Sequence, residues 1–273
     1  MKNQTRSWKI LLWTGLFFGL LMSTCKLFDS NGENGENDYE PAPLTDIDSN
    51  EYQTVKLWEH IWMAENLRTT RYNDGTPIIT GLNREEWESS SEGAYAIYPH
   101  QDVEGIDSDQ DMVNAYGILY NWQATRDPRG LCPEGWRIPE FDEYQDMRDF
   151  VNDKRQAGFD GIGDALKAAR QVGHPWGGVH DTDVHPRWGA NENHFGRDEF
   201  DFTAYAAGFR TSHDYRQYEG DYRALGYEAV WWSSRESATD AFVFRIWSWE
   251  NFTILNTASK KDGVSVRCIR DAR

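Results

Sequence analysis

The sequence predicts an α+β domain in which two early helices precede short antiparallel strands joined by long loops. Apolar side chains recur at helical spacing in the middle of the chain. The last third instead contains short runs of β-branched and aromatic residues, separated by Gly, Asp and Ser. No internal repeat of about 20 to 50 residues is present, so a propeller or a solenoid is not expected.

The expected elements can be placed along the chain. Alternating apolar residues over 52–57 and 60–63 predict a hairpin. The clearest helix has acidic residues in its first turn and places four apolar residues on one face: Phe141, Tyr144, Met147 and Val151. A shorter helix is expected over 163–172. The expected strands of the last third are 200–205, 229–234, 241–247, 252–255 and 264–269.

Residues 1–24 have the composition of a bacterial export signal. A basic start precedes an apolar run over 10–22, which is too short to span a bilayer comfortably. The run ends in Leu-Met-Ser-Thr-Cys, which resembles the lipobox at which a cysteine is diacylated and becomes the first residue of the mature protein. Thr24 departs from the usual Gly, Ala or Ser, and ordinary cleavage or an uncleaved anchor are the alternatives. We expect lipidation at Cys25.

Residues 25–50 are polar and acidic, and they are expected to form a flexible tether because they cannot bury enough apolar surface to order themselves. Acidic residues near Cys25 resemble the surface-export signals of Bacteroidetes lipoproteins, which implies an outer-membrane, cell-surface location. The net charge of -17 becomes more negative when the signal, which carries three basic and no acidic residues, is removed. Such a chain repels phosphate backbones, so nucleic acid is not an expected partner. The membrane contact is the lipid anchor.

Two cysteines remain beyond the lipobox, Cys132 and Cys268. In an exported chain, such a pair is more typical of a disulfide than of a metal or redox site. A bridge would close a long loop, for which the chain-entropy relation gives about 4 to 5 kcal/mol of stabilisation. The alternative is two free, buried cysteines that act as small apolar residues.

Seven blocks of sequence lie in order over 52–271. They are 52–56 with 62–67, 73–78, 116–122, 130–139, 207–210, 231–234 and 265–268. Together they resemble the Fibrobacter succinogenes major paralogous (FISUMP) domain. The resemblance implies a C-type-lectin-like fold over 51–273, in which a long disulfide joins the first helix to the last strand. The family has no established reaction, so the resemblance implies a scaffold more than a function.

The chain departs from the family pattern at two places. Glu140 follows Pro139 where the family usually has Thr or Ser, so the main helix is expected to have a weaker N-terminal cap. Residues 173–197 form a segment that is longer than its family counterpart and rich in His, Trp, Gly and Asp.

Metal sites are weakly indicated. Imidazole and carboxylate side chains are dense between His174 and His194, and the weak candidates for metal ligands are His180, Asp183 and His185. Their spacing matches no recognised zinc motif, and a polar loop is the favoured interpretation. The acidic run 107–111 lacks the Gly and Glu of an EF-hand, so it is expected to be a solvated loop. No cofactor is predicted.

Catalysis is not expected. Formylglycine-generating enzymes share the fold that the resemblance implies, but they need reactive cysteines, and the sequence contains no nucleophile elbow, zinc-protease motif or phosphate loop. Ligand binding is favoured because aromatic side chains are common anchors at recognition surfaces. The candidate ligand-binding residues are Trp176, Trp188, Tyr215, Tyr218, Tyr222, Trp247 and Trp249.

The sequence therefore predicts a non-catalytic, lipid-anchored envelope protein that binds a polysaccharide or a protein partner. The alternatives are a purely structural subunit of an outer-membrane complex and, less favoured, a catalyst of the formylglycine-generating type. Recognition is expected on the loops between the two cysteines, above all 173–197 and 211–226.

Overall fold

The computed structural model describes residues 43–101, 103–155, 161–212 and 221–272. The expected signal and Cys25 lie outside these ranges, as do Tyr215 and Tyr218. Among the described residues, no helix is both long enough and apolar enough to cross a membrane.

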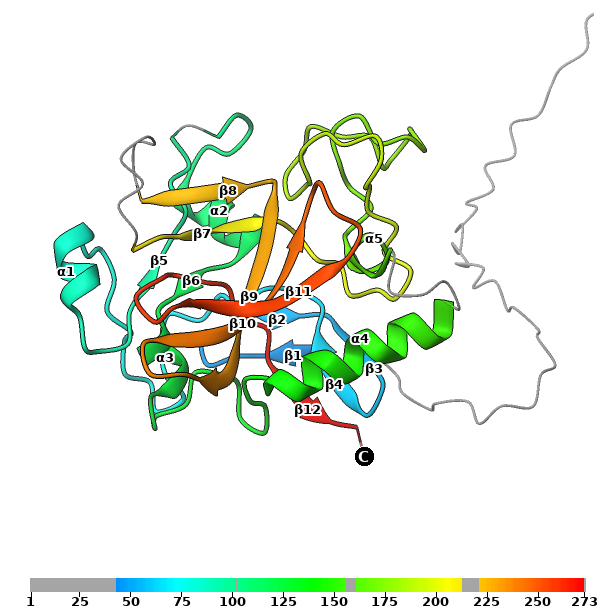
Figure 1. Ribbon diagram of the computed structural model, residues 1–273. Coiled ribbons are helices and arrows are strands. Elements are labelled where there is room, and N and C mark those ends of the chain that lie inside the picture. The colour runs from blue at the N-terminus through cyan, green and yellow to red at the C-terminus, as the bar shows by residue number, and fades with distance from the viewer. Residues whose placement is uncertain (1–42, 102, 156–160, 213–220, 273) are drawn as a thin grey trace, which may run out of the picture. The chain divides into compact units, whose positions relative to one another are not determined.

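Short antiparallel strands form the β part of the domain (Figure 1). The largest sheet has the order β11-β10-β9, and a second sheet has the order β12-β4-β3. The strands of these sheets are β3 (Thr54–Leu57), β4 (His60–Met63), β9 (Glu228–Glu236), β10 (Asp240–Trp247), β11 (Thr253–Ser259) and β12 (Ile269–Asp271). Three pairs complete the set: β1 (Leu44–Thr45) with β2 (Glu51–Tyr52), β5 (Tyr95–Ala96) with β6 (Leu119–Tyr120), and β7 (Ala207–Arg210) with β8 (Tyr222–Leu225).

The described helices are α1 (Arg84–Ser89), α2 (Asp109–Tyr116), α3 (Trp122–Arg126), α4 (Phe141–Arg155) and α5 (Ile162–Leu166). The combination of helices and antiparallel strands confirms the predicted α+β class.

Helix α4 follows the predicted pattern closely. Tyr144, Met147 and Val151 are buried, and the Tyr144 ring stacks on Phe244 of β10 with centroids 4.8 Å apart. The expected weakening of its cap by Glu140 is offset, because the Glu143 carboxylate accepts a hydrogen bond of 2.6 Å from the Glu140 backbone N–H. The apolar face therefore packs α4 against the β11-β10-β9 sheet, and the Glu143 contact caps its first turn.

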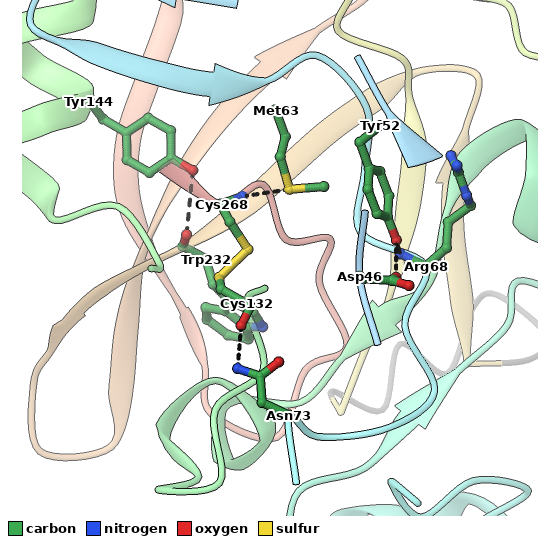
Figure 2. The surroundings of a disulfide bond; sticks show 9 residues. All are labelled: Asp46, Tyr52, Met63, Arg68, Asn73, Cys132, Tyr144, Trp232 and Cys268. Carbon is green, nitrogen blue, oxygen red and sulfur yellow. Dashed lines mark hydrogen bonds between the residues drawn. A yellow bond between two sulfur atoms is a disulfide. The ribbon is translucent and has the colours of Figure 1, made fainter. Parts of the chain in front are cut away.

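Cys132 and Cys268 form the predicted disulfide, with a Cα–Cα distance of 5.9 Å (Figure 2). The backbone on both sides of the bridge is hydrogen-bonded. The Asn73 amide donates to the Cys132 carbonyl at 2.6 Å, and the Met63 N–H donates to the Cys268 carbonyl at 3.0 Å. The bridge joins the segment that leads into α4 to the segment that leads into β12. The last strand agrees with what the resemblance implied, but α4 is not the first helix, because α1, α2 and α3 precede it.

The folded domain begins earlier than the sequence indicated. Residues 43–50 were assigned to the tether, but β1 pairs with β2 and the Asp46 side chain is buried. The Tyr52 hydroxyl donates to Asp46 at 2.6 Å, and the Arg68 N–H donates to that hydroxyl (Figure 2). A buried carboxylate held in this way belongs to the core, which polar composition alone does not reveal.

Four expected elements differ in the structure. The strand expected over 264–269 is replaced by β12 at Ile269–Asp271, and Val264 and Ser265 form only isolated bridges with Tyr120 and Trp231. The strand expected over 200–205 is wrong: Thr203 lies in the left-handed region, and the buried Arg267 guanidinium satisfies the carbonyls of Phe202 and Thr203 instead of a neighbouring strand. The short helix ends at Leu166 rather than at 172. The acidic run 107–111 contains the start of α2, where the Ser108 hydroxyl accepts from the Asp111 N–H and caps the helix.

Candidate functional site

A cleft of about 430 Å³ lies between α2, β8 and the inserted segment 173–197. Its wall carries four tyrosines and a small number of charged or polar groups: Tyr98, Tyr116, Tyr222, Tyr227, Glu104, His185, Arg187 and Asp221. These residues come from segments far apart in the sequence, and the fold brings them together. Such a mixture of aromatic faces and convergent polar groups is typical of a binding site for a small molecule or one unit of a polymer.

The tyrosine rings form much of the cleft. Tyr98 and Tyr222 meet edge to face with their centroids 5.4 Å apart. Tyr227 is 51% exposed, so one side of its ring is open to a ligand. Gly189 makes room for this ring, because a Cβ at that position would lie 2.8 Å from a Tyr227 ring carbon. The Gly189 N–H also donates to the Gly226 carbonyl at 2.7 Å, which fixes the inserted segment beside the turn that carries Tyr227.

A hydrogen-bonded chain connects α2 to the inserted segment within the cleft wall. The Tyr116 hydroxyl lies 2.6 Å from Nδ1 of His185, and Nε2 of His185 lies 3.1 Å from the Glu104 carbonyl. Burial raises the pKa of Tyr116 to about 12, and burial together with Arg187 lowers the pKa of His185 below 6.5. Neutral His185 therefore donates through Nε2 to the carbonyl and accepts at Nδ1 from the tyrosine.

The charges around the cleft are nearly balanced. Asp221 is paired with Arg84 at 3.0 Å and with Arg210 at 3.4 Å. Arg187 donates through Nε to the Asp183 carbonyl, and its terminal nitrogens make no hydrogen bond to any part of the chain that the structure describes. The Glu104 carboxylate likewise has no protein partner among those residues. The cleft thus offers one guanidinium and one carboxylate for hydrogen bonding, beside the aromatic rings.

A buried lysine holds the inserted segment against the rest of the domain. The Lys167 ammonium donates to the Asp164 carboxylate at 3.1 Å and to the carbonyls of His194, Ser248 and Glu250. Burial lowers the pKa of Lys167, and the Asp164 charge opposes that shift. Because these oxygens belong to α5, the inserted segment and the β10–β11 turn, the ammonium ties one helix and two loops together.

The family model that describes the Fibrobacter succinogenes major domain matches residues 55–270. The chain belongs to this family. The match confirms the resemblance read from the sequence blocks, and it covers the cleft, the disulfide and the inserted segment alike. No curated protein and no solved structure matches the chain.

Within this Fibrobacter succinogenes major domain, the predicted ligand-binding residues lie in different places, and not all of them line the cleft. Tyr222 lines the cleft. Trp188 was a wrong choice: it is 1% exposed and its indole N–H donates to the Ala204 carbonyl, so the ring belongs to the core. Trp247 and Trp249 stack with centroids 5.6 Å apart at the β10–β11 turn, outside the cleft. Trp176 is 54% exposed and packs with His174, His180 and Phe195, also outside it.

Sequence reasoning missed Tyr98, Tyr116 and Tyr227. Tyr116 lies in the family block 116–122, and its ring is buried in the cleft wall with its hydroxyl beside His185. Tyr227 follows Gly226, whose φ of 80° marks a turn. An aromatic residue directly after a turn glycine was the one local signal that this ring lies at the surface of the domain.

The weak metal candidates are not gathered into one donor set. His185 is engaged by Tyr116 and Glu104, and the rings of His180 and His174 lie together away from it. Among the described residues, a group with metal-like spacing is His60, Glu143 and Asp271. Nη2 of Arg137 lies 2.5 Å from Glu143 and 3.1 Å from Asp271, so a guanidinium already occupies the position that a cation would take. This group is an ion-pair cluster at the start of α4.

Proposed function

We propose that this protein is a non-catalytic binding protein of the cell envelope, and that its cleft recognises a neutral sugar unit of a polysaccharide. The observation that carries this proposal is the set of four tyrosines around a cleft of about 430 Å³. Flat aromatic faces pack against the C–H surfaces of a pyranose ring, while Glu104 and Arg187 can hydrogen-bond its hydroxyls.

The charge balance supports a neutral rather than an anionic sugar. Asp221 is neutralised by two arginines, and Arg187 is accompanied by Glu104 in the same wall. The whole chain carries a net charge of -17, which repels polyanions. A ligand without carboxylate or sulfate groups therefore fits the cleft best.

The fold and the cysteines favour binding over catalysis. We propose a C-type-lectin-like fold on the basis of the early helix, the late strands and the bridge between Cys132 and Cys268. A catalyst of the formylglycine-generating type needs reactive cysteines, and the two described cysteines are used in the bridge. A structural subunit of an outer-membrane complex remains the second candidate, for which a stoichiometric partner in a native pull-down would be the expected sign.

The location is proposed from the N-terminal sequence. A lipobox-like Cys25 and an acidic segment after it support a lipid anchor and the outer-membrane surface. Mass spectrometry of the mature protein is expected to find an acylated N-terminal Cys25, and the protein is expected to enter the detergent phase on extraction. A mature chain that starts elsewhere and stays in the aqueous phase would refute the anchor.

The binding proposal is tested with a glycan array that holds neutral and anionic polysaccharides, followed by affinity electrophoresis on the hits. We expect neutral hits whose affinity falls about 10-fold or more in Tyr227→Ala, because an exposed aromatic at a binding site is a typical hot spot. Trp58→Ala is the matched control, since Trp58 is 49% exposed but lies outside the cleft. An array without hits, or equal losses in the two variants, would refute sugar binding at the cleft.

A further inference from the structure

A second concave surface lies on the outer side of α4, and it shares no lining residue with the cleft. It is a groove of about 600 Å³ between α4 and the turn that joins β3 to β4. Its lining residues are Trp58, Asp146, Asp149, Phe150, Asp153 and Lys154. We call this surface the α4 groove.

One wall of the α4 groove is aromatic and open. Trp58 is 49% exposed, and its ring centroid lies 6.1 Å from that of Phe150. Trp58 occupies the two-residue turn between β3 and β4 with a φ of 58°, a conformation that Gly or Asn adopts far more readily than a bulky residue. A large apolar ring is thus held at the surface, beside the helix, where solvation would favour a polar side chain.

The other wall is a row of carboxylates. Asp146, Asp149 and Asp153 follow each other at intervals of three and four residues, so they lie on one exposed stripe of α4. None of the three takes part in an ion pair with another residue that the structure describes. Other surface acids of the helix are paired: Asp142 lies near Arg235, and Glu143 is bonded to Arg137.

The α4 groove already accommodates one cation. The Lys154 ammonium lies 5.6 Å from the centroid of the Phe150 ring, in a cation–π arrangement. The Trp58 ring has no such partner among the described residues. The groove therefore combines an exposed indole ring with three carboxylates that form no ion pair with a described residue, which is the chemistry that recognises an ammonium or guanidinium group.

We propose that the α4 groove docks a basic segment of a protein partner. A lysine or arginine side chain of that segment lies against Trp58, and neighbouring basic residues face the stripe of Asp146, Asp149 and Asp153. Charge complementarity selects this occupant, because lipid head groups and nucleic acids that are anionic would be repelled by the same stripe. The protein would then hold a basic partner on α4 while its cleft stays free.

The proposal is tested with the full chain and a fluorescently labelled hexalysine peptide, with hexaglutamate as the charge-reversed probe. We expect hexalysine to bind, hexaglutamate not to bind, and Asp149→Asn with Asp153→Asn to weaken binding about 10-fold. The matched control is Glu85→Gln with Glu92→Gln, which removes the same charge from exposed residues in and after α1, on another side of the domain (Figure 1). Thermal melting checks that each variant is folded.

Two further variants separate the groove from general attraction to an acidic protein. Trp58→Ala keeps the charge and is expected to weaken hexalysine binding, whereas Tyr227→Ala, in the cleft, is expected to leave it unchanged. Equal losses in the two double variants would show that only net charge attracts the peptide, and would overturn the proposal. Unchanged affinity in Trp58→Ala, or no binding of hexalysine to the unaltered chain, would overturn it as well.

Discussion

Two regions of this domain are held together by different kinds of interaction. The clasp region consists of the disulfide, α4, β4 and β12, and it relies on a covalent bond and on apolar side chains at regular spacing. The cleft region consists of the inserted segment 173–197, α2 and β8. Its inserted segment contains no helix or strand and is positioned by polar contacts such as those of Lys167 and His185 and by the buried ring of Trp188.

The difference explains why one region determines the fold and the other can carry recognition. Many different sequences with the same apolar pattern can form a periodic apolar face, so the fold of the clasp region is maintained when individual residues change. A loop held by a few hydrogen bonds can exchange its outward side chains without disturbing that scaffold. If this division is correct, changes in the clasp region should affect global stability, and changes in the cleft region should affect binding more than stability.

The largest loss of stability is expected when the disulfide is removed. Cys132→Ala with Cys268→Ala opens a loop of 136 residues, and we expect a loss of about 4 kcal/mol in the free energy of unfolding. Chemical denaturation with and without reductant measures this loss. The double variant should be insensitive to reductant. A loss below about 1 kcal/mol would mean that α4 and β12 hold the region without the bridge.

The next largest loss of stability is expected at the boundary between the clasp region and the cleft region. Lys167→Met leaves the buried Asp164 carboxylate and three carbonyls without their donor, and we expect a cost of about 3 kcal/mol. Hydrogen exchange measured by mass spectrometry should show faster exchange in 190–197 and 248–252, with α4 nearly unchanged. Uniform acceleration that includes α4 would contradict a division into two regions.

A smaller, pH-dependent effect is expected at the start of α4. Burial raises the pKa of Glu143, but its hydrogen bonds from Arg137 and the Glu140 N–H outweigh this, so the pKa lies below 4.5. A lowered carboxyl pKa adds stability that is complete above the unfolded value and is lost as the pH falls through the folded value. Unfolding at pH 7 and at pH 3 should show that Glu143→Gln loses about 1 kcal/mol at pH 7 and less at pH 3. An equal loss at both pH values would show that packing, not charge, is responsible.

An effect on stability no larger than that of Glu143→Gln is expected in the cleft wall. Tyr116→Phe removes one hydroxyl, which contacts His185 and the Arg187 backbone, and should cost about 1 kcal/mol in unfolding free energy. Sugar affinity should fall by more than this change in stability suggests, because His185 loses the partner that fixes its ring. Titration of the variant with a hit from the glycan array, with Tyr95→Phe as a control outside the cleft, measures the effect. Unaltered affinity would remove Tyr116 from the site.

The clasp region could largely be predicted from the sequence, and the cleft could not. Cys132, Cys268 and the apolar row of α4 carry their signals locally, through counting and periodicity. The cleft combines Tyr98, Tyr116 and Tyr227 from three separate segments, so no local pattern marks them as neighbours. Trp188 was misassigned because a tryptophan in a polar loop resembles an exposed anchor, whereas here its ring fills the core beneath that loop.

Helix capping and buried polar groups account for other differences between the elements predicted from the sequence and those in the structure. The hydroxyl of Ser108 followed by Asp111 is a helix-start signal, but the carboxylates around it suggested an acidic loop. The expected strand near Phe202 was overridden by Arg267, whose guanidinium lies against the Phe202 and Trp231 rings, at 4.5 and 5.1 Å from their centroids. A buried arginine that supplies hydrogen bonds to a loop replaces the ladder that a strand would need.

The position of the bridge has a consequence for proteolysis. Both parts of the cleft that come after α4 lie between Cys132 and Cys268, and Val179 in the inserted segment is 84% exposed. A protease that cuts the chain near Val179 therefore produces two fragments that stay linked through sulfur. Such a nick would be invisible on a non-reducing gel and would separate into two bands only after reduction. The domain can lose a peptide bond in the inserted segment and still remain one covalent molecule.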